Sequence, residues 1–213
     1  MKNILVISPH PDDEAIGCGG TIALHISWGD VVHVIFLTSG EKGGHGKPEK
    51  QTIATREQEA KDAARILKIE KTDFWREPDG NLEATDNNIA RLAEKLNVFR
   101  PAVIYVPHNN EDHHDHKSAY DLVKQLLQYP DHVFNKPEVF CYEVWTPIQQ
   151  IDLVHDISAQ VEIKREAIRA HKSQCEVMDF DEAILGLNRY RGEMHSWPGG
   201  DYAEVFMKMD TSK

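Results

Sequence analysis

The sequence predicts an α/β fold: a single-domain, Rossmann-like, mostly parallel sheet with helices on both faces. Short apolar runs, often rich in β-branched residues, alternate along the chain with longer segments of helical periodicity, and this alternation is typical of βαβ units. The chain has 213 residues, of which 40% are hydrophobic. That is enough for one core, so we expect residues 1–213 to form one domain.

Five segments have the composition of strands, and five others have the periodicity of helices. The predicted strands are 2–8, 31–37, 72–75, 102–106 and 138–145, and the predicted helices are 15–28, 55–67, 86–99, 115–127 and 161–171. The helix at 86–99 has Leu92 and Leu96 on one face, and Asp86 can cap it. Residues 38–48 hold four glycines and are predicted to form a mobile loop. A second predicted loop, 197–200, precedes a short apolar segment at 202–207.

Composition excludes two classes of function. The formal net charge is −11 and the basic residues are not clustered, which argues against binding to nucleic acid or to an anionic membrane surface. No apolar run reaches the length of a membrane span or of a signal-peptide core, so we expect a cytoplasmic protein. The three cysteines lie far apart, which predicts neither a disulfide framework nor a thiolate zinc site.

Two polar segments follow predicted strands, at the strand ends where open α/β sheets bind ligands. The first reads Pro-His-Pro-Asp-Asp-Glu at 9–14. Its three adjacent carboxylates repel one another unless a positive charge lies among them, although acidic residues also favour a helix N-terminus. The second reads Asp-His-His-Asp-His at 112–116, and His113 and His116 share a face if they begin the next helix.

Together the two segments offer histidine, aspartate and histidine from distant parts of the chain. Three protein ligands with one open position are typical of a catalytic zinc, which makes hydroxide available at neutral pH. A carboxylate beside the metal can act as general base, and a further histidine can polarise a carbonyl. These parts predict hydrolysis of an amide. The residues alone do not decide which of Asp12 and Asp13 binds the metal.

At these two segments the sequence resembles the PIG-L/LmbE-like deacetylases, whose marks are a PHPDDE-type motif and a later HxDH motif. The second motif reads His-His-Asp-His at 113–116, with His114 where the family usually has proline. Weaker similarities extend over most of the chain. They are the RxxE-type segment at 56–60, Pro-Asp-Gly at 78–80, AHKSQ at 170–174 and AEVF at 203–206.

The resemblance implies roles for individual residues. The implied ligands of Zn²⁺, with Fe²⁺ as the alternative metal, are His10, Asp13 and His116. The implied catalytic residues are the general base Asp12, an oxyanion-stabilising imidazolium His113, and Asp115, which orients His113. The implied substrate-binding residues are Arg56, Asp79, Glu41 and Glu204.

The resemblance also implies the substrate class, a small-molecule amino-sugar conjugate that loses an N-acetyl group. Known members deacetylate N-acetylglucosamine linked to inositol, lipid-linked inositol or malate, and the bacterial malate-linked branch, in bacillithiol synthesis, fits a short cytoplasmic protein best. Homo-oligomers are common in the family. Two alternatives compete with this hypothesis: a non-haem Fe(II) enzyme with the same 2-His-1-carboxylate site, which leaves Asp12 without a role, and a catalytically silent sugar-binding protein.

Two further groups of residues are assigned more modest roles. The Gly-Cys-Gly-Gly segment at 17–20 fails the spacing of a dinucleotide loop, so we attribute its glycines to close helix–sheet packing and treat Cys18 as a small core residue. Trp145, Trp197 and Tyr202 can line a sugar pocket, although such residues are more often core or loop anchors.

Overall fold

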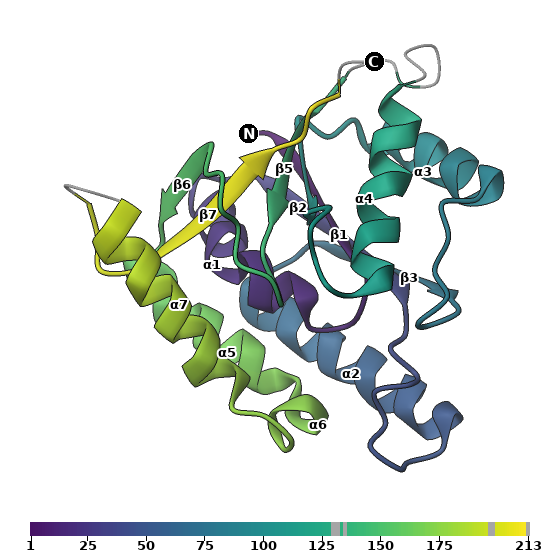
Figure 1. Ribbon diagram of the computed structural model, residues 1–213, viewed down its shortest axis with the longest axis horizontal. Coiled ribbons are helices and arrows are strands. Elements are labelled where there is room, and N and C mark those ends of the chain that lie inside the picture. The colour runs from purple at the N-terminus through teal and green to yellow at the C-terminus, as the bar shows by residue number, and fades with distance from the viewer. Residues whose placement is uncertain (129–132, 134–135, 196–198, 212–213) are drawn as a thin grey trace.

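The computed structural model describes residues 1–128, 133, 136–195 and 199–211. Within these residues, seven strands form one sheet in the order β3-β2-β1-β4-β5-β7-β6 (Figure 1). Their bounds are β1 Asn3–Ser8, β2 Val31–Thr38, β3 Lys71–Glu77, β4 Val103–Pro107, β5 Glu138–Tyr142, β6 Leu153–Asp156 and β7 Ala203–Lys208. Strands β1 to β5 pair in parallel, whereas β7 is antiparallel to both β5 and β6. The mostly parallel α/β fold is therefore confirmed.

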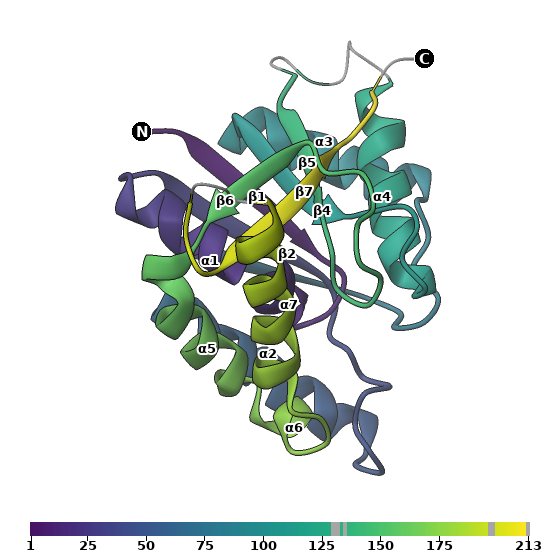
Figure 2. The same ribbon diagram turned by 60° about the vertical axis from the view of Figure 1, so that its left-hand side comes forward.

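Helices cover both faces of this sheet (Figures 1 and 2). Their bounds are α1 Asp13–Ser27, α2 Glu49–Leu67, α3 Asp86–Phe99, α4 His114–Leu127, α5 Val161–Ala170, α6 Lys172–Cys175 and α7 Phe180–His195. Alternate residues of β1 point to opposite faces: Ile4 and Val6 pack in the core with α1, α2 and α5, and Leu5 and Ile7 pack with α3 and α4. A strand buried on both faces is apolar throughout, which is why β1 reads as a continuous apolar run.

The structure corrects several boundaries and adds elements that were not predicted. Strand β6 and helices α6 and α7 were not predicted, β3 is longer than expected, and α2 begins at Glu49, directly after the predicted loop and not at Thr55. The strand expected at 138–145 stops at Tyr142. Helix α3 is capped by Thr85, whose side chain accepts a hydrogen bond from the Asn88 N–H, so Asp86 is its first helical residue and not its cap. Trp197 and Pro198, in the predicted loop 197–200, lie outside the described residues.

No helix among the described residues is long and apolar enough to cross a membrane.

The glycines of α1 are explained by close packing, as predicted. A Cβ at Gly17 would lie 2.1 Å from the Tyr142 ring, and one at Gly20 would lie 2.7 Å from Ile157. The helix is also broken at Cys18, whose backbone has φ −145° and ψ 22°. Cys18 itself is fully buried, as expected for a core residue. The segment from Asp13 to the break is thus a short helical turn set at the carboxyl end of β1.

From β1 the chain adds β2 and β3 on one side of the sheet and then crosses to add β4 on the other side of β1. The direction of strand order therefore changes between β1 and β4. Such a switch point is where open α/β sheets bind ligands, beyond the carboxyl ends of the strands. The loops that follow β1 and β4 carry the two polar segments identified in the sequence, so the fold brings them together at this edge.

Candidate active site

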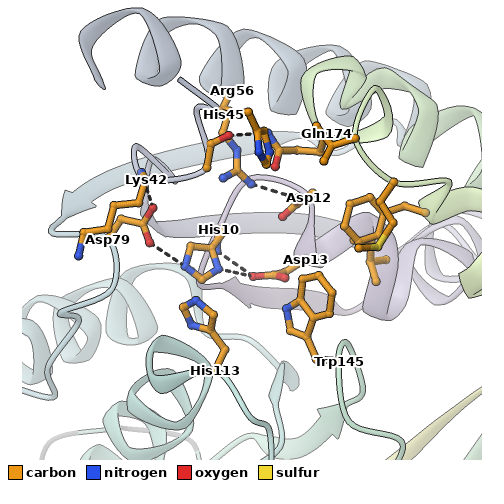
Figure 3. Close-up of a pocket in the computed structure, with 15 residues that line it drawn as sticks. His10, Asp12, Asp13, Lys42, His45, Arg56, Asp79, His113, Trp145 and Gln174 are labelled. Carbon is orange, nitrogen blue, oxygen red and sulfur yellow. Dashed lines mark hydrogen bonds and ion pairs between the residues drawn. The ribbon is translucent and has the colours of Figure 1, made fainter. Parts of the chain in front are cut away.

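Asp13 lies between two histidines from different loops. Its Oδ2 is 3.1 Å from His10 Nδ1 and 3.2 Å from His116 Nε2. All three side chains are buried, and Figure 3 shows the His10 ring directed at the Asp13 carboxylate. His10 and Asp13 stand on either side of the turn after β1, and His116 projects from the first turn of α4. The three residues expected to bind metal are therefore close enough to share one ion.

His116 supplies an independent sign that a ligand is expected here. Its side chain is fully buried, and its Nε2 and Nδ1 face the carboxylates of Asp13 and Glu111 at 3.2 and 3.8 Å, yet neither nitrogen makes a hydrogen bond within the described residues. A buried nitrogen that makes no hydrogen bond is costly. Tetrahedral zinc with bonds of about 2.0–2.1 Å separates its ligand atoms by roughly 3.3 Å, close to the distances that Asp13 makes to both rings. The residues present therefore fit a bound divalent metal.

The opposite nitrogen of His10 faces two more carboxylates. His10 Nε2 lies 3.2 Å from Asp115 Oδ2 and 3.2 Å from Asp79 Oδ1 (Figure 3 shows Asp79). Burial lowers the pKa of His10, but Asp115, Asp13 and Asp79 outweigh it and hold this pKa well above its usual value. The cluster thus favours an added positive charge at its centre, and a proton shared between Nε2 and Asp115 leaves Nδ1 free to bind a metal.

Asp115 differs from the role expected of it. Its carboxylate contacts His10 and accepts hydrogen bonds from the backbone N–H groups of Gly80 at 2.6 Å and Leu82 at 3.2 Å. Only its backbone N–H reaches His113, donating to Nδ1 at 3.2 Å. The Asp115 carboxylate therefore orients His10 rather than His113. Its pKa is lowered to about 2, because contacts with His10 and these N–H groups outweigh burial.

His113 is half-buried and caps α4, because its Nδ1 accepts the Asp115 N–H. Its ring lies 4.7 Å from that of His10 and 5.1 Å from that of His116, centroid to centroid. Burial and these two histidines lower the pKa of His113. With Nδ1 accepting, the neutral ring carries its proton on Nε2. The structure thus favours a neutral donor where the imidazolium was expected, and exposed His114 stands outside the cluster.

Asp12 occupies a strained position at the start of α1. Its φ is 137°, a region that residues with a side chain rarely adopt, and such strain persists only where neighbours enforce it. The Asp12 N–H donates to Glu14 Oε2 at 3.1 Å, and Arg56 donates to its Oδ2 at 3.0 Å. Glu14 in turn lies 3.2 Å from Nε2 of the buried His171. Burial raises the pKa of Asp12 to about 6, against the opposing effect of Arg56.

The glycine-rich loop is fastened to the site. Arg56, on α2, donates to the Gly40 carbonyl at 3.0 Å and to the Pro11 carbonyl at 2.8 Å, so its guanidinium ties the loop to the turn after β1. Asp79 Oδ2 accepts the Lys42 N–H at 2.8 Å, and Glu41 accepts the Asp79 N–H at 2.8 Å. Arg56 and Asp79 line the catalytic cavity, whereas Glu41 lies behind Asp79 and acts on its position.

The substrate-binding role expected of Glu204 is wrong, because its side chain does not reach the cavity. It is 1% exposed and is absent from the described residues that line the cavity. Its two oxygens accept the backbone N–H groups of Gly20 and Thr21, at 2.9 and 2.7 Å, and one lies 2.6 Å from Lys164 Nζ. The Lys164 ammonium also donates to the Ile16 carbonyl at 2.8 Å. The pair therefore satisfies backbone groups that the break in α1 leaves free.

Two further residues of the site were given no role in the sequence analysis. Glu111 is fully buried, and it accepts backbone N–H groups from 144–146 while its Oε2 lies 3.8 Å from His116 Nδ1. Gln174 lines the cavity and donates to the Gly43 carbonyl at 3.1 Å. Gln174 lies in the family-like AHKSQ segment, whereas only its polar type after a strand indicated Glu111. Trp145, one of three aromatic residues considered for a sugar pocket, does line the cavity.

The site opens into a cavity of about 330 Å³, at the lower end of the range for small-molecule sites. Its polar lining residues are His10, Asp12, Asp13, Lys42, His45, Arg56, Asp79, His113 and Gln174. A metal-ligand set, a buried carboxylate with a raised pKa and a proton-bearing imidazole converge there, at the switch point of an α/β sheet. This combination defines a metal-dependent hydrolase.

Comparison with known proteins gives the family. The family model PIG-L, described as GlcNAc-PI de-N-acetylase, matches residues 5–127, and the chain belongs to this family. It is 30% identical to a diacetylchitobiose deacetylase of Thermococcus kodakarensis, over 96% of this chain and 82% of the relative. It is also 30% identical to a probable N-acetyl-alpha-D-glucosaminyl L-malate deacetylase 2 of Bacillus subtilis, over 83% of this chain and 85% of the relative.

Two further similarities widen this picture. A 4-oxalmesaconate hydratase of Pseudomonas putida is 27% identical over 84% of this chain and 77% of that protein. The crystal structure of the conserved protein TT1542 from Thermus thermophilus has a TM-score of 0.83 and 31% identity, and the match covers 100% of this chain and 97% of that one. The family and its deacetylase members support an enzyme that acts as an N-deacetylase.

Proposed function

We propose that this protein is a zinc hydrolase that removes the N-acetyl group from a 2-acetamido-sugar conjugate. The observation that carries the proposal is the position of Asp13, whose Oδ2 lies within 3.2 Å of a ring nitrogen on both His10 and His116, beside the buried base Asp12. Hydrolysis of an amide needs a polarised carbonyl, an activated water and a proton for the leaving amine.

Three residues would hold the metal: His10 through Nδ1, Asp13 through Oδ2 and His116 through Nε2. His113 also has a ring nitrogen within 4.8 Å of those of His10 and His116, but its Nδ1 is occupied by the Asp115 N–H. Two nitrogen ligands and one oxygen ligand suit zinc, and ferrous iron is the alternative. When bound, such an ion acts as a Lewis acid and lowers the pKa of water.

Asp12 serves as the general base. Its carboxylate lines the cavity, and Arg56 and Glu14 fix its position from the carboxylate and from the backbone N–H. A pKa of about 6 leaves it mostly ionised at neutral pH yet basic enough to accept a proton. Asp12 takes a proton from the attacking water and then gives one to the nitrogen as the amide C–N bond breaks, so that acetate and a free amine leave.

His113 stabilises the developing oxyanion by donating from Nε2. The Asp115 N–H donates to Nδ1 of His113, so the proton of the neutral ring stays on Nε2, which faces the substrate as a donor. Asp79 and Arg56 would contact the sugar from the polar side of the cavity, each already anchored by protein groups. Two relatives are named as a deacetylase of diacetylchitobiose and a probable deacetylase of N-acetyl-alpha-D-glucosaminyl L-malate. Both names suit a small amino-sugar substrate. The cytoplasmic location stays a prediction.

Release of acetate separates this proposal from the hydratase reaction of one relative. A hydratase adds water without breaking a C–N bond, so it yields no acetate. The deacetylase relatives favour hydrolysis.

The test is acetate release from N-acetylglucosamine conjugates by the metal-loaded protein and two variants. We expect Asp12→Asn to lower kcat by about 10²-fold or more, the scale of a lost general base, while metal content stays unchanged. Asp62→Asn, at a half-buried aspartate of α2 that is not among the lining residues of the cavity, is the matched control and should turn over like the parent protein. Unchanged turnover in Asp12→Asn would remove Asp12 from the mechanism, and absence of acetate from every conjugate would refute the function.

A further inference from the structure

The catalytic cavity has an apolar wall opposite its charged groups. We use this name for Ile16, Trp145, Val177, Met178 and Phe180, which all line the cavity. Three of them are well exposed: Trp145 by 50%, Val177 by 57% and Met178 by 46%. Contiguous exposed apolar side chains mark surfaces that bind something, and here they border the reacting groups. Figure 3 shows Trp145 on the other side of the His10–Asp13 pair from Arg56.

The wall is anchored to the same framework as the catalytic residues. Glu111 accepts the backbone N–H of Trp145 and of both neighbours, and the same carboxylate lies beside His116. The Trp145 ring packs edge-on against Phe180, with 5.7 Å between centroids. Because Trp145 is held in this way, its ring loses little conformational entropy when a ligand covers it.

The charged side of the cavity is committed to internal contacts. The Arg56 guanidinium already donates to Gly40, Pro11 and Asp12, and both Asp79 oxygens contact protein groups. The carboxylates of Asp12, Asp13 and Asp79 also face this space, and Lys42 and His45 line it with them. An anionic substituent would therefore meet three carboxylates, an arginine that is already bound and one lysine, whereas an apolar substituent would cover exposed Trp145, Val177 and Met178.

We propose that the apolar wall is a subsite for an apolar aglycone, so that the enzyme selects amino-sugar conjugates bearing an aryl or alkyl group over conjugates with an anionic one. The inference rests on the proposed function and departs from the malate-linked substrate that the sequence suggested. Burial of apolar surface against the wall lowers KM, because it acts away from the bond that breaks.

The experiment compares acetate release from three N-acetylglucosaminides with phenyl, methyl and malyl aglycones. We expect kcat/KM for the phenyl conjugate to exceed that for the methyl conjugate by about tenfold or more, mainly through KM, and the malyl conjugate to be no better than methyl. The double variant Val177→Ser/Met178→Ser should bring the phenyl-to-methyl ratio close to one. The control Val98→Ser, at a 79% exposed valine on α3, should leave the ratio unchanged.

Equal kcat/KM for phenyl and methyl conjugates, or a preference for malyl, would overturn the subsite. If no conjugate releases acetate, the proposed function fails, and calorimetric binding of the same three conjugates then tests the wall by itself. Tighter binding of phenyl than of methyl, lost in the double variant, would support the subsite. Equal binding of the two would overturn it.

Discussion

Two clusters of buried charge lie on either side of the first turn of α1, and they differ in how well their polar groups are satisfied. In one, Lys164 and Glu204 pair at 2.6 Å and bind three backbone groups freed by the break in the helix. In the other, the carboxylates of Asp13, Asp79 and Asp115 contact His10, and the two buried ring nitrogens of His116 make no hydrogen bond within the described residues. The first cluster is complete in the protein alone, whereas the second would be completed by the proposed cation.

The first cluster therefore has a structural role and the second a functional one, although both lie at the start of α1. A satisfied buried pair stabilises the fold, and removing one partner leaves an uncompensated charge. A cluster that lacks a positive charge is costly to the fold and is retained where chemistry needs it. Mutations in the first cluster should therefore reduce stability, and mutations in the second should reduce activity more than stability.

The largest effect is expected for Lys164→Met, which strands the Glu204 carboxylate in the core. Removing one partner of a buried pair costs about 3–5 kcal/mol, so we expect a loss of this size in the free energy of unfolding, measured in urea. Lys50→Met, at an exposed lysine on α2, is the control and should change stability by less than about 0.5 kcal/mol. An unfolding midpoint for Lys164→Met equal to that of the control would contradict the comparison.

A smaller change in stability but a clear loss of activity is expected for His113→Ala. Removing one oxyanion donor lowers kcat by about 10²-fold or more, about 2.7 kcal/mol in the barrier, whereas loss of the α4 cap costs about 1 kcal/mol in stability. Steady-state kinetics and urea unfolding measure the two. His114→Ala, one residue away and exposed, is the matched control. If His114→Ala lost more activity than His113→Ala, the two histidines would have to exchange roles.

An effect no larger than the change in barrier for His113→Ala is expected from added zinc, a stabilisation that depends on pH. Metal at about 100 times its Kd stabilises the folded protein by about 2.7 kcal/mol. Because the pKa of His10 is raised in the metal-free fold, its proton stabilises that fold below the unfolded pKa of about 6.5, and this contribution is lost as pH rises through the raised value. Metal and proton compete for His10, so the rise in Tm on adding zinc should be larger at about pH 8 than at about pH 6. An equal or opposite pH trend would argue against a metal on His10.

Much of the fold was readable because its strands are buried on both faces. The apolar runs at β1 and β2 predict buried strands, and the amphipathic pattern at α3 predicts a helix. Helix α7 escaped because three of its five buried residues are polar or charged, Asp181, Asn188 and Arg191, so it has no apolar stripe. Strand β6 has four residues, none of them fully buried, and leaves no alternating pattern.

The site was readable where its residues cluster in sequence and not where they meet only in space. The two motifs placed His10, Asp13 and His116 at neighbouring strand ends, and the structure brings them together. Glu204 could not be placed, because nothing local shows that its side chain points at α1 and Lys164. The contact of the Asp115 carboxylate with His10 likewise depends on tertiary packing across more than 100 residues.

The most direct test is the zinc content of the protein and of Asp13→Asn after dialysis against metal-free buffer, with Asp62→Asn as control. Asparagine keeps the shape of the side chain but removes the charge that lies between the two histidines. We predict one zinc ion per chain in the parent protein and the control, and a large loss in Asp13→Asn. Full zinc content in Asp13→Asn would contradict a metal held by His10, Asp13 and His116.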